Sequence, residues 1–249
     1  MIKDKNVLIL GASGGIGKAL VEELLERYPY VNIFATYRDG LSHVESLSGI
    51  DSKRVSWFRC DFLKETDIQS LSEFVFSAGS QLHLVINAVG LLHTEKHQPE
   101  KSIKQVESDY FIENIRTNTL PTLLLAKMFQ LHVRQTKDLV FAIVSAKVGS
   151  IEDNRLGGWT SYRCSKAALN MAIKNISLEW KRVIPNACVV ALHPGTTDSK
   201  LSLPFQANVP KGKLFSSRKT AAYLLSVIES LNPGSSGKFY SWDGSEIPW

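Results

Sequence analysis

Short runs of β-branched and apolar residues alternate along the chain with longer segments in which apolar residues recur at helical spacing. This alternation is typical of a parallel sheet whose strands are joined by crossover helices. It predicts a single α/β domain, residues 1–249, built on a doubly wound parallel seven-stranded sheet with helices on both faces. The predicted strands are 6–10, 31–37, 55–60, 82–87, 139–145, 187–193 and 238–242. The predicted helices are 15–28, 67–79, 113–135, 165–183 and 217–231.

Composition fits this interpretation, because 249 residues with 44% hydrophobic content can bury one large core. Cys60, Cys164 and Cys188 are odd in number, widely spaced and form no CxxC pair, so neither disulfides nor a metal site is expected. They are interpreted as small buried apolar residues. The first apolar run is too short for a signal peptide or a membrane span, and a cytoplasmic location is therefore expected.

The net charge of +5 is compatible with nucleic acid, a membrane surface or an anionic cofactor as partner. The Lys and Arg residues are scattered and form no run or stripe. We therefore expect no nucleic acid and no membrane as partners, and interpret most of these charges as solvated surface.

A glycine-rich turn, GASGGIG with Gly11, Gly15 and Gly17, links the first strand directly to the first helix. Glycines permit a tight turn and close approach of the backbone to a pyrophosphate, and the N-terminus of a helix favours anions. A glycine cluster alone is also compatible with an ordinary flexible turn. Its position between strand and helix predicts a Rossmann-type dinucleotide site.

The end of the second strand distinguishes the two nicotinamide cofactors. An acidic residue there would bind a ribose hydroxyl, whereas a basic one would bind a 2′-phosphate. The sequence is Thr36, Tyr37 and Arg38, followed by Asp39, which we interpret as a loop residue. Arg38 therefore favours NADP (NADPH) over NAD, although a plain surface charge is an open alternative.

Tyr162 and Lys166, in SYRCSK, stand four residues apart on a predicted helix and so share one face. An ammonium group in that position can stabilise a phenolate. A free tyrosine titrates near ~10, so action as a base near neutrality requires a close cation or a charged cofactor. A Tyr-x-x-x-Lys pair by itself is common, and the surrounding motifs decide its meaning.

Four motifs in order, GASGGIG, NAVG at 87–90, Tyr162-x-x-x-Lys166 and HPG at 193–195, resemble the classical short-chain dehydrogenase/reductase family over essentially the whole chain. The stretches SIEDNRLGGWTSYRCSKAALN and GKFYSWDGSEIPW further resemble the branch of C-factor signalling proteins and small carbonyl reductases. The resemblance implies hydride transfer between a nicotinamide and a small-molecule carbonyl or alcohol substrate.

Roles of individual residues are likewise implied by the resemblance. Tyr162 would be the acid/base, Lys166 its partner, and Asn118 the helix asparagine that holds a relay water. Ser199 replaces a usual threonine in the loop facing the nicotinamide. Cofactor contacts would come from Gly11, Ser13, Gly15, Ile16, Gly17, Arg38, Asp61, Asn87, Ala88, Gly90, Tyr162, Lys166, Pro194, Gly195 and Thr197.

The chain departs from the family at the serine that normally precedes a glycine by three positions and polarises the substrate oxygen. Three positions before Gly149 stands Ala146. Ser145 points to the opposite face of an extended strand, unless a bend at the strand end brings it or Ser150 round. We assign the catalytic hydroxyl to Ser145 on that condition. Loss of such a donor costs about two to three orders of magnitude in rate.

A segment without clear periodicity, about 197–215, lies between the sixth strand and the last helix. Long loops of this kind are often functional lids. Its apolar Leu201, Leu203 and Phe205 suggest closure over a hydrophobic substrate, and Trp159 lies close enough to Tyr162 to line the same pocket.

Two functions remain open on the sequence. The first is an NADP-dependent oxidoreductase of the carbonyl reductase kind, and the second is a non-enzymatic NADP-binding signalling or scaffold protein of C-factor type. The helices near 108–134 and 161–183 resemble the pair with which the family forms homodimers or homotetramers. The preceding segment SIEDNRLGGW could block that face.

Overall fold

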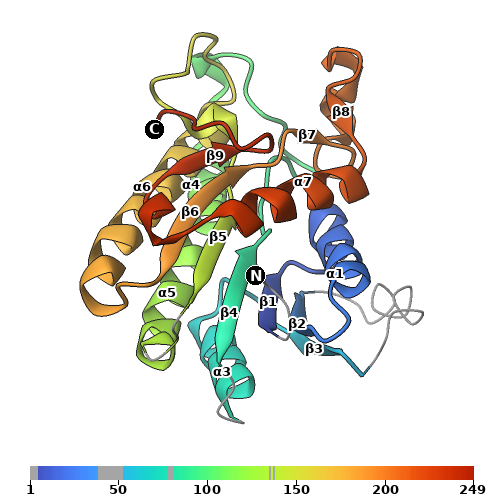
Figure 1. The fold of residues 1–249 in the computed structure, drawn as a ribbon. Helices are drawn as coiled ribbons and strands as arrows, with labels where there is room; N and C mark the ends of the chain where they lie inside the picture. The colour runs from blue at the N-terminus through green and yellow to red at the C-terminus, as the bar shows by residue number, and fades with distance from the viewer. Residues whose placement is uncertain (1–4, 39–52, 78–80, 135, 137) are drawn as a thin grey trace.

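The computed structural model describes residues 5–38, 53–77, 81–134, 136 and 138–249. Its main sheet has seven strands in the order β3-β2-β1-β4-β5-β6-β9, and every neighbouring pair is parallel (Figure 1). The predicted sheet is thus confirmed. Its strands are β1 (Asn6–Leu10), β2 (Asn32–Tyr37), β3 (Val55–Arg59), β4 (Leu82–Asn87), β5 (Val140–Val144), β6 (Cys188–His193) and β9 (Phe239–Ser241).

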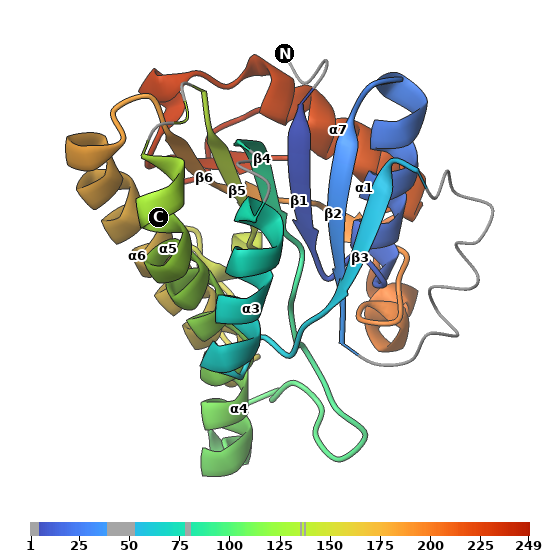
Figure 2. The same cartoon turned by 90° about the horizontal axis from the view of Figure 1, so that it is seen from below.

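Helices cover both faces of the sheet because successive strand residues point to opposite sides. Val7 and Ile9 of β1 belong to the core beneath α1 (Gly15–Arg27) and α7 (Ser217–Ser230). Leu8 and Leu10 belong to the core on the other side. Figures 1 and 2 show that second layer. It comprises α3 (Glu65–Phe76), α4 (Ser108–Asn118), α5 (Leu120–Val133) and α6 (Thr160–Val183).

The predicted helix 113–135 was wrong in one respect, because the structure divides it into α4 and α5 at Thr119. Pro121 has no N–H, so the carbonyl of Thr117 loses its helical hydrogen-bond donor there. Near this break, the hydroxyl of Thr119 donates to the carbonyl of Ser165 on α6 at 2.9 Å in a buried bond. The break therefore also joins α4 and α5 to α6.

The segment 197–215 contains more structure than its sequence predicts. It includes the short helix η3 (Leu203–Asn208), and its two ends pair as β7 (Thr196–Thr197) and β8 (Leu214–Phe215). The base of the segment is thereby fixed beside the carboxyl end of β6. Strands of two residues are too short to produce a hydrophobic period, which explains why the sequence does not reveal them.

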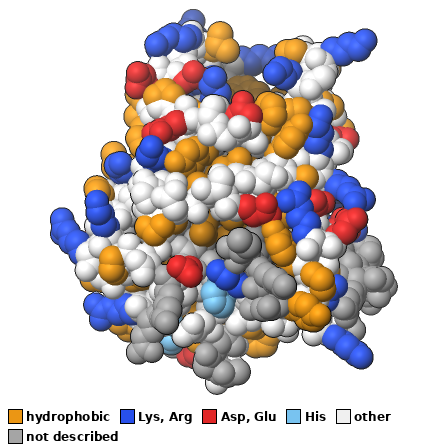
Figure 3. Space-filling view, viewed as in Figure 1, with side chains coloured by type: hydrophobic (Ala, Val, Ile, Leu, Met, Phe, Trp, Pro, Cys, Tyr) orange, Lys and Arg blue, Asp and Glu red, His pale blue; other side chains and the backbone are white. Residues whose placement is uncertain are grey.

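The charged side chains on the surface are scattered as the sequence predicts, but one of the three cysteines is not buried as predicted. On the face shown in Figure 3, Lys and Arg side chains lie scattered among acidic and apolar ones. Cys60 and Cys188 are buried as predicted, whereas Cys164 is exposed because it lies on the outer side of α6. Within the described ranges, no helix is both long and apolar enough to cross a membrane.

Candidate active site

The strand order reverses between β1 and β4, and this is where parallel α/β sheets bind their ligands, at the carboxyl ends of the strands. β1 leads into the glycine turn, β4 ends at Asn87, β5 is followed by Ala146, and β6 ends at His193. α6 adds Tyr162 and Lys166 to this edge. The topology therefore gathers the predicted motifs in one region.

The glycine turn forms the tight cradle that a pyrophosphate requires. Gly11 has φ +71, and a Cβ on Gly17 would lie 2.1 Å from the carbonyl oxygen of Gly11. Gly14 is the N-cap of α1 and has no side chain that could bond to the first N–H groups of the helix. These N–H groups could therefore bind an anion. Ser13 and Ile16 are half-buried in the same turn. These residues fit a dinucleotide.

Thr36 anchors this turn to β2, a role that the sequence does not reveal. Its hydroxyl accepts from the N–H of Gly11 at 3.1 Å, and its carbonyl accepts from the N–H of Ala12 at 2.9 Å. The side chain is fully buried. The sequence shows only a threonine two residues before a basic residue, and its burial against Gly11 becomes visible in the fold.

Arg38 is exposed directly after the carboxyl end of β2. Its carbonyl accepts from Nε of Arg59 at 3.2 Å. Asp39, the predicted loop residue, lies outside the described residues. Arg38 remains the predicted phosphate contact.

The adenine side of the predicted site is held by side chains that bond to the protein itself. Asn87 donates from Nδ2 to the hydroxyl of Thr122 at 2.9 Å and accepts from the N–H of Val89 at 3.0 Å. The N–H of Ala88 donates to the carbonyl of Leu10 at 3.1 Å. Asp61 accepts from the N–H of Leu63 at 3.1 Å. These bonds shape the backbone that a nucleoside would contact.

Tyr162 and Lys166 are buried together at the sheet edge. The ammonium of Lys166 lies 5.8 Å from the centre of the Tyr162 ring and donates to the carbonyl of Val144 at 3.2 Å. Burial lowers the pKa of Lys166 to about 8. Burial, and secondarily the nearby Tyr110, raises the pKa of Tyr162 instead of lowering it. The tyrosine of the chain alone is therefore a proton donor.

Asn118 connects the site to α4 with both ends of its amide. Its Oδ1 accepts from the N–H of Leu91 at 2.7 Å, and its Nδ2 donates to the carbonyl of Leu91 at 2.8 Å. Nδ2 also donates to the hydroxyl of Ser165 at 2.9 Å, and Ser165 in turn donates to the carbonyl of Tyr162 at 2.8 Å. Gly90 approaches the same group, since a Cβ there would lie 3.5 Å from Oδ1 of Asn118 and 3.6 Å from Nζ of Lys166.

The assignment of Ser145 as polarising donor is contradicted by the geometry. Its hydroxyl is buried and donates to Oδ1 of Asn170 at 2.7 Å, while Nδ2 of Asn170 donates to the carbonyl of Gly149 at 3.2 Å. The required bend is absent at Ala146, whose φ of −147 and ψ of 141 are extended. Ser150 is also buried, and its hydroxyl accepts from the N–H of Asp153 at 3.1 Å.

The loop after β6 has the shape that the motif predicts. Gly195 has φ +73, and a Cβ there would lie 2.7 Å from the ring of Phe215 and 3.1 Å from that of Trp242. Pro194 is buried beside it. The hydroxyl of Thr197 pairs with that of Thr220 at 2.8 Å, so Thr197 offers a cofactor only its backbone in this conformation.

An aromatic group covers the approach to Tyr162. The ring of Trp159 lies 6.4 Å from that of Tyr162 and 5.0 Å from that of Phe205, which in turn lies 5.9 Å from His93. The predicted lid is thus in contact with the tyrosine through Phe205. Leu203 is 64% exposed and makes no contribution to this aromatic group.

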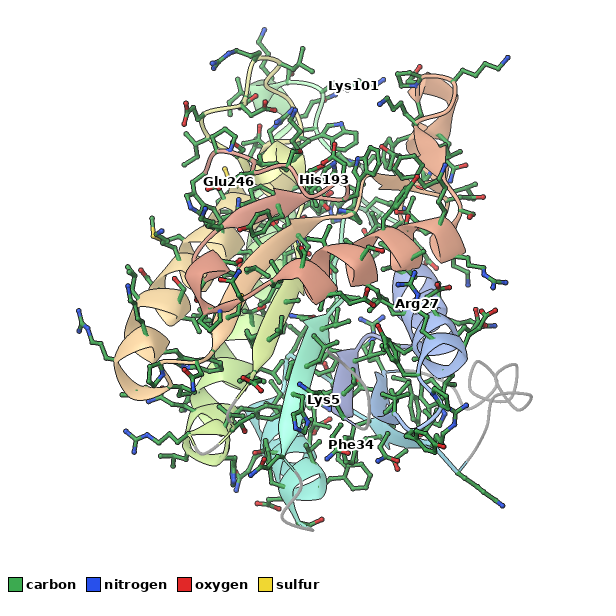
Figure 4. All side chains as sticks on the ribbon, viewed as in Figure 1. Lys5, Arg27, Phe34, Lys101, His193 and Glu246 are labelled. Carbon is green, nitrogen blue, oxygen red and sulfur yellow. The ribbon has the colours of Figure 1, made fainter. Side chains whose placement is uncertain are left out.

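His193 lies at the end of β6, labelled above the centre of the molecule in Figure 4. Its Nδ1 accepts from the N–H of Lys147 at 3.3 Å. Burial lowers the pKa of His193 to about 4, with a smaller contribution from Lys147. It is therefore neutral near neutrality and holds the turn after β5. In the part of the chain that the structure describes, no cluster of side chains suits a metal ion.

Comparison with known proteins supports the same family for the chain. Residues 5–209 match the family model of short chain dehydrogenase. A 1-hydroxy-2-glutathionyl-2-methyl-3-butene dehydrogenase from Rhodococcus sp. (strain AD45) is 26% identical over 243 residues, covering 98% of this chain and 99% of that protein. The C-signal of Myxococcus xanthus is 38% identical over 109 residues, which are 43% of this chain and 60% of that protein.

A solved structure resembles the whole fold. NADPH-bound carbonyl reductase from chicken fatty liver has a TM-score of 0.86 at 28% identity, covering 98% of this chain and 99% of that one. These matches agree with the resemblance that the four sequence motifs indicate.

Proposed function

We propose that this chain, which belongs to the short chain dehydrogenase family, reduces a small-molecule carbonyl compound with NADPH. The observation that carries the proposal is the buried pair of Tyr162 and Lys166 beside the glycine turn. Burial raises the pKa of Tyr162, which keeps its proton available for an alkoxide that forms during reduction. Burial of Tyr162 in the chain alone therefore favours proton donation, which is the step that reduction requires.

The residues divide the work as follows. A bound nicotinamide supplies the hydride. Tyr162 donates its phenolic proton to the carbonyl oxygen, and Lys166 stabilises the phenolate that remains. Asn118 and Ser165 fix the helix on which Tyr162 lies, through bonds of 2.9 and 2.8 Å. Trp159 and Phe205 exclude water from the approach to the tyrosine.

The cofactor preference is proposed from Arg38. A guanidinium offers a planar, permanently charged fork to a 2′-phosphate, and Thr36, Tyr37 and Arg38, the described residues at the end of β2, include no carboxylate. The carbonyl reductase from chicken fatty liver that the fold resembles was solved with NADPH bound. Together these observations favour NADP over NAD.

A second function, NADP-dependent signalling or scaffolding without turnover, is favoured by one observation. Ala146 cannot donate a hydrogen bond, the hydroxyl of Ser145 donates to Asn170, and Ser150 is buried. The C-signal similarity points in the same direction but covers only 43% of the chain. The Tyr162–Lys166 pair makes reduction the stronger proposal.

We also propose that the protein assembles as a homodimer, extending to a tetramer, through α5 and α6. Leu131, Met171 and Leu178 are 72, 61 and 52% exposed on these helices. Between the helices lies a shallow hollow of about 420 Å³ that reaches Trp180. The segment 150–159 contacts the C-terminal Trp249 and Glu100 at the N-terminal end of α6, away from this face.

The expected cytoplasmic location stays a prediction, to be checked by cell fractionation.

Turnover of a panel of carbonyl compounds with NADPH and with NADH tests the function. We expect reduction with NADPH, at least tenfold tighter binding of NADPH than of NADH, and loss of that ratio in Arg38→Ala. Tyr162→Phe should abolish reduction while NADPH binding stays nearly unchanged, because the ring alone suffices for packing. Lys166→Ala should impair both.

Absence of turnover over the whole panel, combined with intact NADPH binding, would favour the signalling function. Equal binding of the two cofactors would refute the role of Arg38 without affecting the proposed chemistry.

A further inference from the structure

We propose that Glu100 is a positioning residue for the carbonyl site, acting through the first turn of α6 on Trp159 and Tyr162. The inference rests on the proposed function. Glu100 lies in the connection between β4 and α4, some 60 residues before the helix that it contacts. It is 2% exposed, which is rare for a carboxylate without a strong partner.

The carboxylate of Glu100 caps α6 from outside the helix. Its two oxygens each accept from the N–H of Ser161 at 3.2 Å, and the hydroxyl of Ser161 donates to one of them in a short bond. Ser161 is fully buried and is the second residue of α6. The N-cap residue itself, Trp159, provides no side-chain cap. A carboxylate at this position also suits the positive end of the helix dipole.

The backbone of Glu100 holds the residues just before the helix. Its carbonyl accepts from the N–H of Trp159 at 2.5 Å. A Cβ on Gly158 would lie 3.4 Å from that carbonyl oxygen and 3.5 Å from the carbonyl oxygen of Lys101. Lys101 is labelled in the upper part of the molecule in Figure 4, above His193. Glu100 thus bonds to Trp159 and Ser161, and its carbonyl lies beside Gly158.

Trp159 needs this support because its backbone is strained. It is the one residue other than glycine with positive φ among the residues that the structure describes, at φ 52 and ψ 39. It continues a left-handed run that begins with Gly157 and Gly158 at φ 63 and 64. A bulky residue adopts this conformation only where its surroundings impose it. The bonds to Glu100, together with the bond from Nε of Arg163 to the carbonyl of Gly158 at 2.9 Å, are those surroundings.

The strained conformation places the Trp159 indole against the reacting tyrosine. Its ring lies between Phe205 of the lid and Tyr162, at 5.0 and 6.4 Å. A right-handed conformation at residue 159 would turn the indole away from both rings and leave Tyr162 open to water. Glu100 therefore determines whether the aromatic wall of the carbonyl site exists.

The test compares Glu100→Ala, Glu100→Gln and Trp159→Gly with the wild type, using steady-state kinetics, NADPH titration and amide hydrogen exchange. Glu100→Ala should raise KM for the carbonyl compound at least tenfold, lower kcat, and leave Kd for NADPH within twofold. It should also accelerate exchange at Trp159 and Ser161 at least tenfold, with exchange in α7 unchanged. In KM and in exchange rate, Glu100→Gln should lie between the wild type and Glu100→Ala, because its amide oxygen still accepts from Ser161.

Trp159→Gly separates the two halves of the proposal. Glycine tolerates the left-handed backbone, so the amide of Ser161 should stay protected while KM rises as in Glu100→Ala. Glu95→Ala, at an exposed carboxylate in the same connection, is the matched control and should change nothing. If Glu100→Ala does not fold, Ser161→Ala removes one of the donors and should raise KM and exchange in the same direction.

Unchanged KM together with unchanged exchange in Glu100→Ala would overturn the proposal. An equal loss of NADPH binding would also overturn it, since that outcome indicates general loosening. If the wild type reduces no carbonyl compound, the proposed function fails. The exchange comparison then still decides whether Glu100 holds the first turn of α6.

Discussion

Ser145 shows what burial does to a candidate catalytic hydroxyl. Its single proton is donated to Asn170, whose orientation is fixed by the carbonyl of Gly149. Hydrogen bonds of this kind contribute about 1 kcal/mol to stability and leave no donor for a substrate. The proposed carbonyl site consequently relies on Tyr162 as its donor and has a methyl group at Ala146.

Adding a hydroxyl at position 146 should therefore raise activity. We expect Ala146→Ser to increase kcat by one to two orders of magnitude, because a preorganised donor contributes about 10²–10³ in related sites. Ser145→Ala should lower the free energy of unfolding by about 1 kcal/mol and leave kcat within a few fold. Kinetics and urea denaturation of both variants check this. A hundredfold loss of kcat in Ser145→Ala would restore that serine as the donor.

Residue types were predicted at this scale better than side-chain directions. Tyr162 and Lys166 could be placed because helical spacing determines a shared face. The direction of the Ser145 side chain could not be predicted, because it bonds to Asn170 on a helix far along the chain. The direction of Leu203 could not be predicted either, because this residue faces solvent on a short irregular helix. Glu100 gives no local signal at all, because its partner Ser161 lies 61 residues away.

The glycine turn acts as an element whose tight geometry depends on Gly17. A Cβ there would lie 2.1 Å from the carbonyl oxygen of Gly11, which no side-chain movement can relieve. At Gly14 the corresponding distance is 3.3 Å, and φ is −81. One substitution should therefore disrupt the turn and the other should be tolerated.

We expect Gly17→Ala to weaken NADPH binding at least a hundredfold and to lower thermal stability, whereas Gly14→Ala should change Kd only a few fold. Calorimetric titration and thermal unfolding of the two variants measure both effects. Similar Kd values for the two variants would mean that the turn does not form the cofactor site.

Strands were the most predictable elements because each is buried on both faces and reads as a continuous apolar run. The ends of helices were less predictable than strands. The division between α4 and α5 at Thr119 has a visible cause in Pro121, yet the apolar spacing continues across the division. The β7–β8 pair depends on contacts between Thr196 and Leu214, and no local pattern encodes such a distant pairing.

For the whole molecule, the exposed face of α5 and α6 predicts self-association. Met171 and Leu178 are seven residues apart on one side of α6. Met171→Glu combined with Leu178→Glu should convert a dimer or tetramer into a monomer, because charges would be buried in the interface. Light scattering measures the mass. Leu156→Glu, at a side chain that is 90% exposed away from this face, should leave it unchanged. A monomeric wild type would contradict the proposed assembly.

The buried Lys166 should also give the protein an unusual dependence of stability on pH. Its pKa of about 8 in the fold lies below the ordinary lysine value of 10.5, so unfolding takes up a proton between these values. By itself this group should raise the free energy of unfolding from pH 8 to about 10, whereas the buried thiols of Cys60 and Cys188, whose pKa burial raises to about 12, should lower it above about pH 9. Below pH 8 both states are protonated and the full penalty of burial is present. Tyr162 has a raised pKa and opposes the rise only above about pH 10, where the unfolded tyrosine ionises first.

Replacing the lysine by an apolar side chain should remove this dependence. The difference between 10.5 and 8 corresponds to roughly 3 kcal/mol. Loss of the bond to Val144 offsets about 1 kcal/mol of it. Lys166→Met should therefore be about 2 kcal/mol more stable than the wild type at pH 7, although inactive.

Lys174 is the matched control, because it lies on the same helix and donates to the carbonyl of Gly237 at 3.1 Å, yet is only half-buried. Urea denaturation at pH 7, 8, 9 and 10 should show the advantage of Lys166→Met over the wild type shrinking between pH 8 and 10, while the difference between Lys174→Met and the wild type stays constant, because the other titrating groups are common to all three proteins. A constant difference between Lys166→Met and the wild type would mean that Lys166 is solvated in the folded protein, and that the pair with Tyr162 is open to water.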